Sequence, residues 1–545
     1  MGRKGRWNEC VNNPVAWLIV IGPLALAAIG LVPNRVANSA PRALARAAFA
    51  GAVVAFLVAL ATAAALTLAG PMRTGTLGFA GIGFALYLDN LSAIMFLLVA
   101  FVGAVVLHYS RHYLDGDPNH GRFTRWLCLT LAAVLLLIVS GNMLQLALAW
   151  VATSIGLTRL LRFYPERQAA VLAARKKFVA SRLGDLCLAG AMVLVHRSIG
   201  SLDYGAIFAA AQSLRGGPVP ATLHAVAALL VVAALLKSAQ FPLHGWLTEV
   251  METPTPVSAL LHAGIINAGG FLVLRFSHVI VLSTPSLEIL AIIGGITALF
   301  GSVVMLTQTS VKVALAFSTI AQMGFMMLQC GLGAFSSALL HIVAHSLYKA
   351  HAFLSSGSVI DLARASWSPS PGGRPHPART ALAVVVVLGV ALAAGAMSGA
   401  TPSARPGVFA LGAIVLLGLA HFIANAIDAR PNFYVLGRAA ALAVIVAAGY
   451  FTLQRVGEHL AGGSLPPAQA LRGPFDLAVV IVVVLSFAAV TVLQNLLPRQ
   501  AGTPRWQSLY VHLANGLYVN TVANRLALRY WPPPLRGGSA RESAS

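Results

Sequence analysis

The sequence predicts an all-α, polytopic membrane protein. Its 545 residues are 58% hydrophobic and only 10% charged, whereas a soluble domain carries about 25% charged residues. Apolar runs of about 20 residues, the length that a bilayer-spanning helix needs, recur along nearly the whole chain. A transmembrane β-barrel would alternate apolar and polar residues along each strand, and these runs do not.

These runs predict about 14 to 15 transmembrane helices. They divide the chain into N-terminal helices (1–80), a central block (81–360), C-terminal helices (361–500) and a tail (501–545) with an amphipathic, interfacial pattern. The fifteen runs begin near residues 14, 45, 86, 124, 142, 178, 222, 254, 286, 311, 334, 379, 407, 433 and 475.

The basic residues indicate how the chain is oriented. The net charge is +22, but the basic residues lie in the gaps between apolar runs, which is typical of membrane topology and not of nucleic-acid binding. The most basic gap, residues 159–182, is read as a loop. Because Lys and Arg favour cytoplasmic loops, we expect the N-terminus outside and the C-terminus in the cytoplasm. The other gaps on the basic side hold Arg35, Arg42, Arg46, Arg364, Arg374 and Arg379.

The sequence contains no motif for cofactor or covalent chemistry. It has no Walker A loop, dinucleotide fingerprint, His/Cys metal spacing or nucleophile motif. Its four cysteines are far apart and are read as buried apolar residues: Cys10, Cys128, Cys187 and Cys330. We therefore expect no metal or cofactor in this chain, and no enzyme activity.

Three of the six lysines lie in or at the edge of apolar runs: Lys237, Lys312 and Lys349. A desolvated lysine can lose its proton near neutral pH, whereas arginine stays charged. These lysines therefore fit a proton path, because such a path needs groups that change charge. Snorkelling of the ammonium to the headgroups is the alternative, and it is strongest for Lys312 at the start of a helix.

A histidine stripe precedes one of these lysines. His341, His345 and Lys349 follow at intervals of four residues, which places them along one face of a helix. Histidine titrates near neutral pH, so the stripe fits a proton relay. A zinc site and packing histidines remain as alternatives, although no cysteine or carboxylate accompanies the stripe.

The run that begins near residue 254 has the features of a broken helix. Pro254 and Pro256 stand at its start, Gly269 and Gly270 follow, and His262 lies between them. Broken helices in membranes line cavities or ion sites. The prolines also suit a simple helix start, but that reading leaves His262 unexplained.

Carboxylates are scarce, with fifteen in the chain. Asp185 lies near the expected start of the sixth helix, and Glu249 and Glu252 lie in the gap before residue 254. Any carboxylate near Lys237 would help to hold its proton. These three and Lys312 are the candidate accessory charges, while Asp89 suits a helix N-cap better.

Three stretches together resemble the antiporter-like subunits of respiratory complex I and of Mrp-type cation/proton antiporters: residues 236–270, 308–334 and 341–360. The resemblance covers roughly residues 80 to 360. It implies two inverted five-helix repeats, each with a broken helix, and a path of buried lysines and histidines in a proton-translocation core. The matched positions for ion translocation are Lys237, His262, His341, His345 and Lys349.

Two departures leave the usual antiport circuit incomplete. The family usually has a glutamate after the tryptophan of the fifth helix, paired with the central lysine, but Val151 follows Trp150 here. A charged segment of the second half is also missing, since residues 381–402 contain no ionisable side chain. After the fifteenth run we also expect too little sequence for the long lateral helix of the complex I subunit.

Within the family, the sequence looks most like the membrane subunits of DAB-type inorganic-carbon accumulation systems. This resemblance implies a bacterial inner-membrane protein with a large cytoplasmic, zinc-binding DabA-like partner. The membrane subunit would let H⁺ or Na⁺, with H⁺ favoured, run inward through the lipid bilayer and drive CO₂ hydration to bicarbonate by the partner. The alternatives are a subunit of a complex I-type NADH dehydrogenase or Mrp-type Na⁺/H⁺ antiporter, and a scaffold that moves no ion.

Overall fold

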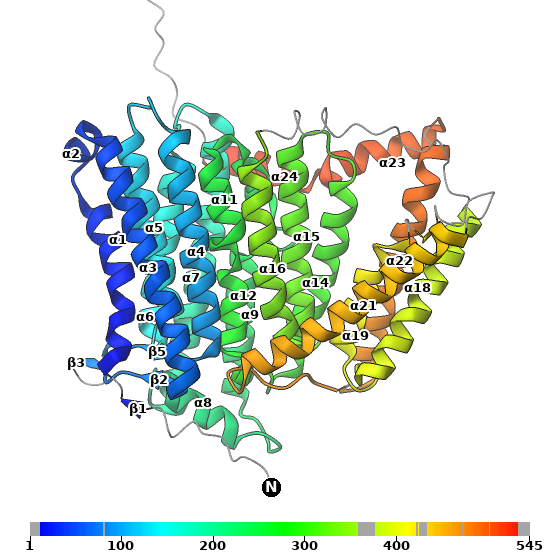
Figure 1. The fold of residues 1–545 in the computed structure, drawn as a ribbon, viewed down its shortest axis with the longest axis horizontal. Helices are drawn as coiled ribbons and strands as arrows, with labels where there is room; N and C mark the ends of the chain where they lie inside the picture. Colours follow the sequence, from blue (N-terminus) through cyan, green and yellow to red (C-terminus); the bar gives the residue numbers. More distant parts are fainter. Residues whose placement is uncertain are drawn as a thin grey trace, which may run out of the picture.

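The chain folds into a row of helices that stand side by side, as the sequence predicts (Figure 1). The computed structural model describes residues 11–12, 14–79, 82–357, 377–420, 423–424, 433–470, 472–500 and 502–531. Five strands of two or three residues lie at one end of the bundle and are exceptions to the all-α prediction. They are β1 (Val11–Asn12), β2 (Met72–Arg73), β3 (Leu77–Phe79), β4 (Ile82–Phe84) and β5 (Tyr87–Leu88).

The N-terminal and central helices form one block with a shared apolar core. The N-terminal elements are η2 (Pro14–Val20), α1 (Ile21–Leu31), α2 (Asn34–Ser39) and α3 (Pro41–Ala69). The central elements are α4 (Asn90–Tyr113), α5 (His120–Ile138), α6 (Met143–Leu161), α7 (Gln168–Ile199), α8 (Tyr204–Ser213), α9 (Ala221–Lys237), α10 (Gly245–Thr248), η3 (Glu249–Glu252), α11 (Thr255–Ala263), η4 (Ile265–Asn267), α12 (Ala268–Arg275), α13 (Ser277–Ile280), α14 (Thr284–Met305), α15 (Val311–Gly331) and α16 (Phe335–Leu354).

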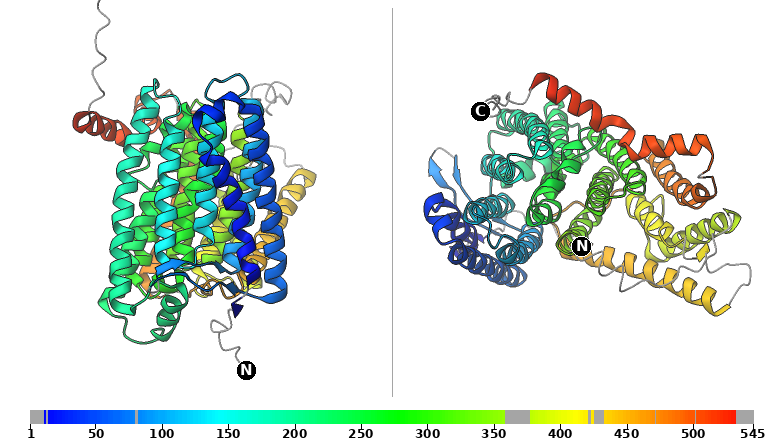
Figure 2. Two further views of the ribbon diagram at one scale, coloured as in Figure 1. Left: turned by 90° about the vertical axis from the view of Figure 1, so that its left-hand side faces the viewer. Right: turned by 90° about the horizontal axis from the view of Figure 1, so that it is seen from above.

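The C-terminal helices pack through a second core against α14 and α15. They slant beside the central block, and the tail runs along one edge of the bundle when it is seen from above (Figure 2). These elements are α18 (Pro377–Ser398), α19 (Pro406–Leu417), α21 (Phe433–Ala461), α22 (Pro474–Gln500), α23 (Pro504–Ala514), η5 (Gly516–Tyr518) and α24 (Val519–Tyr530).

The described residues include eleven helices that are long and apolar enough to cross a membrane. Three shorter apolar helices accompany them: Ala16–Leu31, Ala221–Lys237 and Pro406–Leu417. Together with α16, which carries the histidine stripe, they correspond to all fifteen expected runs. The polytopic all-α prediction is confirmed, whereas the inverted five-helix repeats stay a prediction.

One expected boundary was wrong. The sequence predicts a loop over residues 159–182 and a sixth helix from near residue 178, but α7 already begins at Gln168. Alanine, arginine and lysine are strong helix formers, so this basic segment continues the helix instead of interrupting it. Asp185 consequently lies in the middle of α7, and Lys177 lies inside the helix.

The two ends of the bundle carry different elements. The helix α2 and the tail helices α23 and α24 lie at one end, and the strands and α8 lie at the other (Figure 1). The gap that holds Arg35, Arg42 and Arg46 therefore shares an end with the tail, as expected from the basic pattern. Arg364 and Arg374, like Cys10, lie outside the described residues, and of Arg379 only the backbone is described.

A buried ion pair joins α4 to α12. Asp89 caps α4 as expected, because its side chain accepts a hydrogen bond from the Ser92 backbone N–H at 2.8 Å. The same carboxylate receives two bonds from the Arg275 guanidinium, at 2.9 and 3.2 Å. Both side chains are 2% exposed. The bidentate geometry compensates part of the cost of burying two charges.

We predict that Arg275→Met destabilises the protein by about 3 to 5 kcal/mol, because it leaves the Asp89 carboxylate buried without its partner. The midpoint of thermal unfolding of the purified protein measures the effect. The control is Arg42→Gln, which removes an ion pair to Asp115 whose arginine side chain is 78% exposed and which should leave the midpoint unchanged. Equal midpoints for the two variants would contradict the structural role of the buried pair.

Candidate functional site

Lys237 lies at the end of α9, where that helix breaks inside the bundle. The side chain is buried, with 7% exposure. Its Nζ donates to Ser154 Oγ at 2.7 Å and to the Trp150 carbonyl at 3.4 Å, and it lies 4.3 Å from the centre of the Trp150 ring. The ammonium thus binds a hydroxyl, a carbonyl and an aromatic face within the protein and does not snorkel to the surface.

The structure explains how the site is built without the family's usual glutamate. Ser154, one turn after Val151 on α6, supplies the oxygen that binds Lys237. The carboxylate that acts electrostatically on Lys237 is Asp185 of α7. Arg182 shares this carboxylate, with its Nη2 2.6 Å from Asp185 Oδ2. Asp185 therefore influences Lys237 from a distance, and its role as an accessory charge stays a prediction.

A second lysine, which the sequence pattern did not single out, binds the same serine. Lys177 of α7 is 3% exposed and donates to the Ser154 carbonyl at 2.7 Å and to Thr158 Oγ1 at 3.3 Å. Lys177 and Lys237 also interact electrostatically. Two ammonium groups repel each other when both are charged, so protonation of one lysine affects the other. Extending the helical pattern back to Gln168 would have placed Lys177 and Ser181 on one buried face.

The breaks of two helices meet beside Lys237. Ser238, just after α9, donates its hydroxyl to the Ile266 carbonyl of η4 at 3.2 Å. Gly269 of α12 packs so closely on α9 that an added Cβ would lie 2.5 Å from the Ala234 carbonyl oxygen. Ala239, within the break, has a φ of 49°, which non-glycine residues rarely adopt. Such local strain persists only where the surrounding structure enforces it.

The expected broken helix is present, but its break lies elsewhere than the prolines and glycines suggested. Pro256 stands in the first turn of α11, so the prolines start the helix. The interruption falls between Ala263 and Ala268, where η4 replaces regular α-helix. Asn267 bridges the break, because its Nδ2 donates to the Ala263 carbonyl at 3.1 Å and to Ser346 Oγ of α16 at 2.8 Å.

His262 lies just before this break and is fully buried. Its Nδ1 lies 3.0 Å from Thr319 Oγ1 of α15, and its ring stacks on Phe353 of α16 with 4.3 Å between ring centres. Thr319 in turn donates to the Leu315 carbonyl at 3.0 Å. The histidine is thus held between α15 and α16, beside the stripe on α16.

The stripe on α16 is oriented toward His262. Lys349 is fully buried and donates to the Leu315 carbonyl at 3.0 Å, the same oxygen that accepts from Thr319. His345 is buried and interacts electrostatically with His262, His341 and Lys349. The rings of His341 and His345 lie 6.1 Å apart. The structure therefore brings four candidates into one cluster, the histidine cluster: His262, His341, His345 and Lys349.

Three ring nitrogens of this cluster lack a hydrogen-bond partner among the described residues. They are the Nε2 atoms of His262, His341 and His345, all of them buried. A buried polar atom without a partner is costly and is uncommon in native structures. Within the described ranges, no three His, Cys, Asp or Glu side chains lie close enough to share a metal ion.

Two clusters have now been described, one around Lys237 and Lys177 and the other around His262 and the stripe on α16. The remaining candidates lie away from both clusters. Lys312, at the start of α15, is half-buried and reaches Thr255 Oγ1 at 3.4 Å. Glu249 forms an ion pair of 2.8 Å with Lys176 and accepts bonds from Asn520 and Asn524 of α24. Glu249 therefore anchors the tail and does not lie beside Lys237. Of Glu252 only the backbone is described.

Two family models match the chain. Residues 140–368 match the one described as "NADH:quinone oxidoreductase/Mrp antiporter, TM". Residues 76–124 match "NADH-Ubiquinone oxidoreductase (complex I), chain 5 N-terminus". The two matches together cover most of the central block, including Lys237, Lys177, His262 and the stripe on α16.

Sequence relatives extend this match to most of the chain. The Halothiobacillus neapolitanus protein named "Probable inorganic carbon transporter subunit DabB2" is 41% identical over 459 residues, which cover 83% of this chain and 82% of that protein. "Probable inorganic carbon transporter subunit DabB" of Hydrogenovibrio crunogenus is 49% identical over 275 residues, about half of each protein. "NADH-quinone oxidoreductase subunit L" of Mycobacterium tuberculosis is 38% identical over 282 residues, 51% of this chain and 44% of that protein.

A solved structure shares the fold. A chain of the Mrp complex from a Dietzia species superposes with a TM-score of 0.65 over 95% of this chain and 59% of that chain, at 23% sequence identity. At this identity the likeness concerns the fold alone.

We predict that Gly269→Ala destabilises the protein by about 1 to 3 kcal/mol, because the new methyl group overpacks the contact between α12 and α9. The matched control is Gly389→Ala in α18, where an added Cβ would meet nothing within 4 Å and alanine favours the helix. Thermal unfolding of both purified variants compares them. A midpoint for Gly269→Ala at or above that of the control would show that the two breaks are not in tight contact.

Proposed function

The chain belongs to the antiporter-like family of membrane subunits of complex I and Mrp antiporters, in the branch of the DabB relatives, and we propose that it conducts a cation for a two-component inorganic-carbon uptake complex. The branch supports inorganic carbon as the substrate, because the DabB2 relative, which matches 83% of this chain, is named a probable inorganic carbon transporter subunit. The two clusters of buried titratable groups support a conducted ion.

The observation that carries the proposal is the placement of buried lysines and histidines on both sides of one broken helix. Lys177 and Lys237 line a small cavity together with Leu261, Ile265 and Ile266 of α11 and η4. His262 lies on the same helix and is directed to the opposite cluster on α16. This arrangement supports a proton path that crosses the interrupted helix between the two groups of side chains.

The partners of these groups suit transfer of a proton better than fixation of a charge. Lys237 and Lys349 bind hydroxyl and carbonyl oxygens, which accept a hydrogen bond from either protonation state of the amine. The unpartnered Nε2 atoms of the histidines leave an acceptor or donor position open for a transferred proton. Protons are consequently the favoured ion, and Na⁺ is the alternative.

Ion flow drives uptake only if it shifts the partner protein between conformational states. An ion that interacts equally with all states leaves the conformational equilibrium unchanged. We propose a large cytoplasmic DabA-like partner, in which zinc would supply the hydroxide for hydration of CO₂ to bicarbonate. The basic end of the bundle, with the tail helices, would face the cytoplasm of a bacterial cell and place the N-terminus outside. The missing glutamate after Trp150 argues against the alternative of a complex I-type or Mrp-type antiporter subunit.

We predict that Lys237→Ala reduces accumulation of labelled inorganic carbon to background in cells that lack carbonic anhydrase and co-express the DabA-like partner. The buried ammonium is the central group of the proposed path, and its loss removes the titratable side chain at the end of α9, while Lys177 of α7 stays beside Ser154. Lys312→Ala, which removes a half-buried lysine outside both clusters, should retain most of the accumulation. Co-purification of the partner verifies assembly, and full accumulation by an assembled Lys237→Ala complex would refute the role of Lys237.

The second cluster is tested by a substitution that keeps the charge. Lys349→Arg leaves a cation that does not release its proton, so we expect the accumulation rate to fall by about tenfold or more. Lys312→Arg serves as the control and should be neutral. If the assembled Lys349→Arg complex works at the normal rate, Lys349 is a static charge and the relay does not pass through it.

A further inference from the structure

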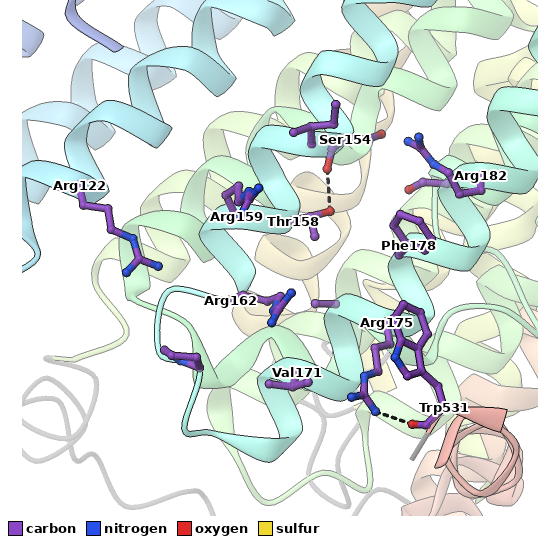
Figure 3. A pocket seen from close by; sticks show the side chains of 14 residues that line it. Arg122, Ser154, Thr158, Arg159, Arg162, Val171, Arg175, Phe178, Arg182 and Trp531 are labelled. Atoms are coloured by element: carbon purple, nitrogen blue, oxygen red, sulfur yellow. Dashed lines mark hydrogen bonds between the residues drawn. The ribbon is translucent and has the colours of Figure 1, made fainter. Parts of the chain in front are cut away.

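An arginine-lined cavity of about 500 Å³ opens between α6 and α7, at the end of the bundle that carries the tail. Figure 3 shows Arg122 of α5 on one side, Arg159 of α6 and Arg162 just after that helix in the centre, and Arg175 and Arg182 of α7 on the other. Trp531, which follows α24, completes the wall. Five guanidinium groups, four on α5, α6 and α7 and one just after α6, thus line one space.

This cavity has a large excess of positive charge. Arg182 pairs with Asp185, and Arg175 donates to the Trp531 carbonyl at 2.5 Å. Arg122 and Arg159 lie over the rings of Phe163 and Trp126, at 5.8 and 5.6 Å. In the described part of the chain, Arg122, Arg159 and Arg162 have no carboxylate partner, and no carboxylate lines the cavity. No described carboxylate neutralises these three charges, so the cavity suits an anion from outside the chain.

The floor of the cavity is the Lys237 site. Ser154, Thr158 and Ser181 line it, and Ser154 is the residue that binds Lys237 through its hydroxyl and Lys177 through its carbonyl. Ser181 also lines the small cavity that contains both lysines. An anion in the arginine cavity would therefore be separated from the two buried ammonium groups by Ser154 alone. Its negative charge would stabilise the charged forms of Lys177 and Lys237.

We propose that this cavity binds an oxyanion of the phosphate or carbonate type. The planar guanidinium offers parallel N–H groups that match two oxygens of such an anion. Its volume lies in the usual range of about 300 to 1,000 Å³ for small-molecule sites. The proposal goes beyond ion conduction, because it assigns a binding site that functions whether or not Lys237 conducts protons.

Two sources present this chemistry. One is the phosphodiester of an anionic phospholipid, which suits the exposed apolar residues Ile155 (47% exposed) and Phe178 (42% exposed) at the cavity wall. The other is free bicarbonate, the product in the proposed reaction. Both would be held by the same guanidinium groups and differ only in what is attached to the anion.

The test measures binding to the purified full chain. In nanodiscs of phosphatidylcholine, sodium bicarbonate is titrated against sodium chloride at equal ionic strength and the thermal unfolding midpoint is followed. In a second arm, native mass spectrometry compares retention of phosphatidylglycerol and phosphatidylcholine. Stabilisation by bicarbonate beyond chloride identifies a free anion, and selective retention of phosphatidylglycerol identifies a headgroup.

Variants locate the site. Arg159→Gln combined with Arg162→Gln should raise the half-saturating concentration of whichever anion binds by about tenfold or more, whereas Arg42→Gln at the same end should not. Replacing the same two arginines with lysine keeps the charge and should weaken binding less, which guards against a variant that fails to fold. The proposal is overturned if neither anion is preferred over its control, or if the double glutamine variant binds as the wild type does.

Discussion

The structure depends on the requirement that backbone groups freed by broken helices find partners inside the protein. No water is available in the hydrocarbon region, so an interrupted helix there has to be satisfied by its neighbours. The breaks of α9 and α11–α12 meet this requirement together, through the Ser238 hydroxyl and the close contact at Gly269. Because Lys237 ends one of these helices and His262 precedes the break in the other, the same contact fixes the positions of both titratable groups.

Buried charge is handled in two different ways in this chain. Arg275 binds a carboxylate with two parallel hydrogen bonds, an arrangement that needs both partners charged and holds them in place. Lys237, Lys177 and Lys349 instead bind hydroxyl and carbonyl oxygens, which tolerate either protonation state of the amine. This contrast separates a structural ion pair from groups that suit proton exchange, and the difference lies in the partners and not in the depth of burial.

The sequence predicted most helices and much of the site, for physical reasons that are specific to each element. Helices could be counted because a helix in the hydrocarbon region needs a long apolar run. Asp89 was correctly predicted as a cap, because a helix N-cap depends only on residues close by in the sequence. Lys177 was missed, because a basic segment was taken for a loop although alanine and lysine favour helix. The arginine cavity was missed for a related reason, since residues from three helices looked like topology signals until the fold placed them around one space. Contacts between residues that are far apart in the sequence, such as those of Glu249 with α24, leave no local sequence pattern and could not be predicted.

The central claim is that ion flow through this chain powers the uptake of inorganic carbon. The most direct measurement is the accumulation of labelled inorganic carbon in cells without carbonic anhydrase that co-express this chain with the DabA-like partner, before and after addition of a protonophore. The account predicts accumulation that requires both proteins and collapses when the protonophore dissipates the proton gradient. Accumulation that persists after the gradient is lost, and that is unaffected by the sodium gradient, would contradict it and would leave the chain as a membrane anchor for its partner.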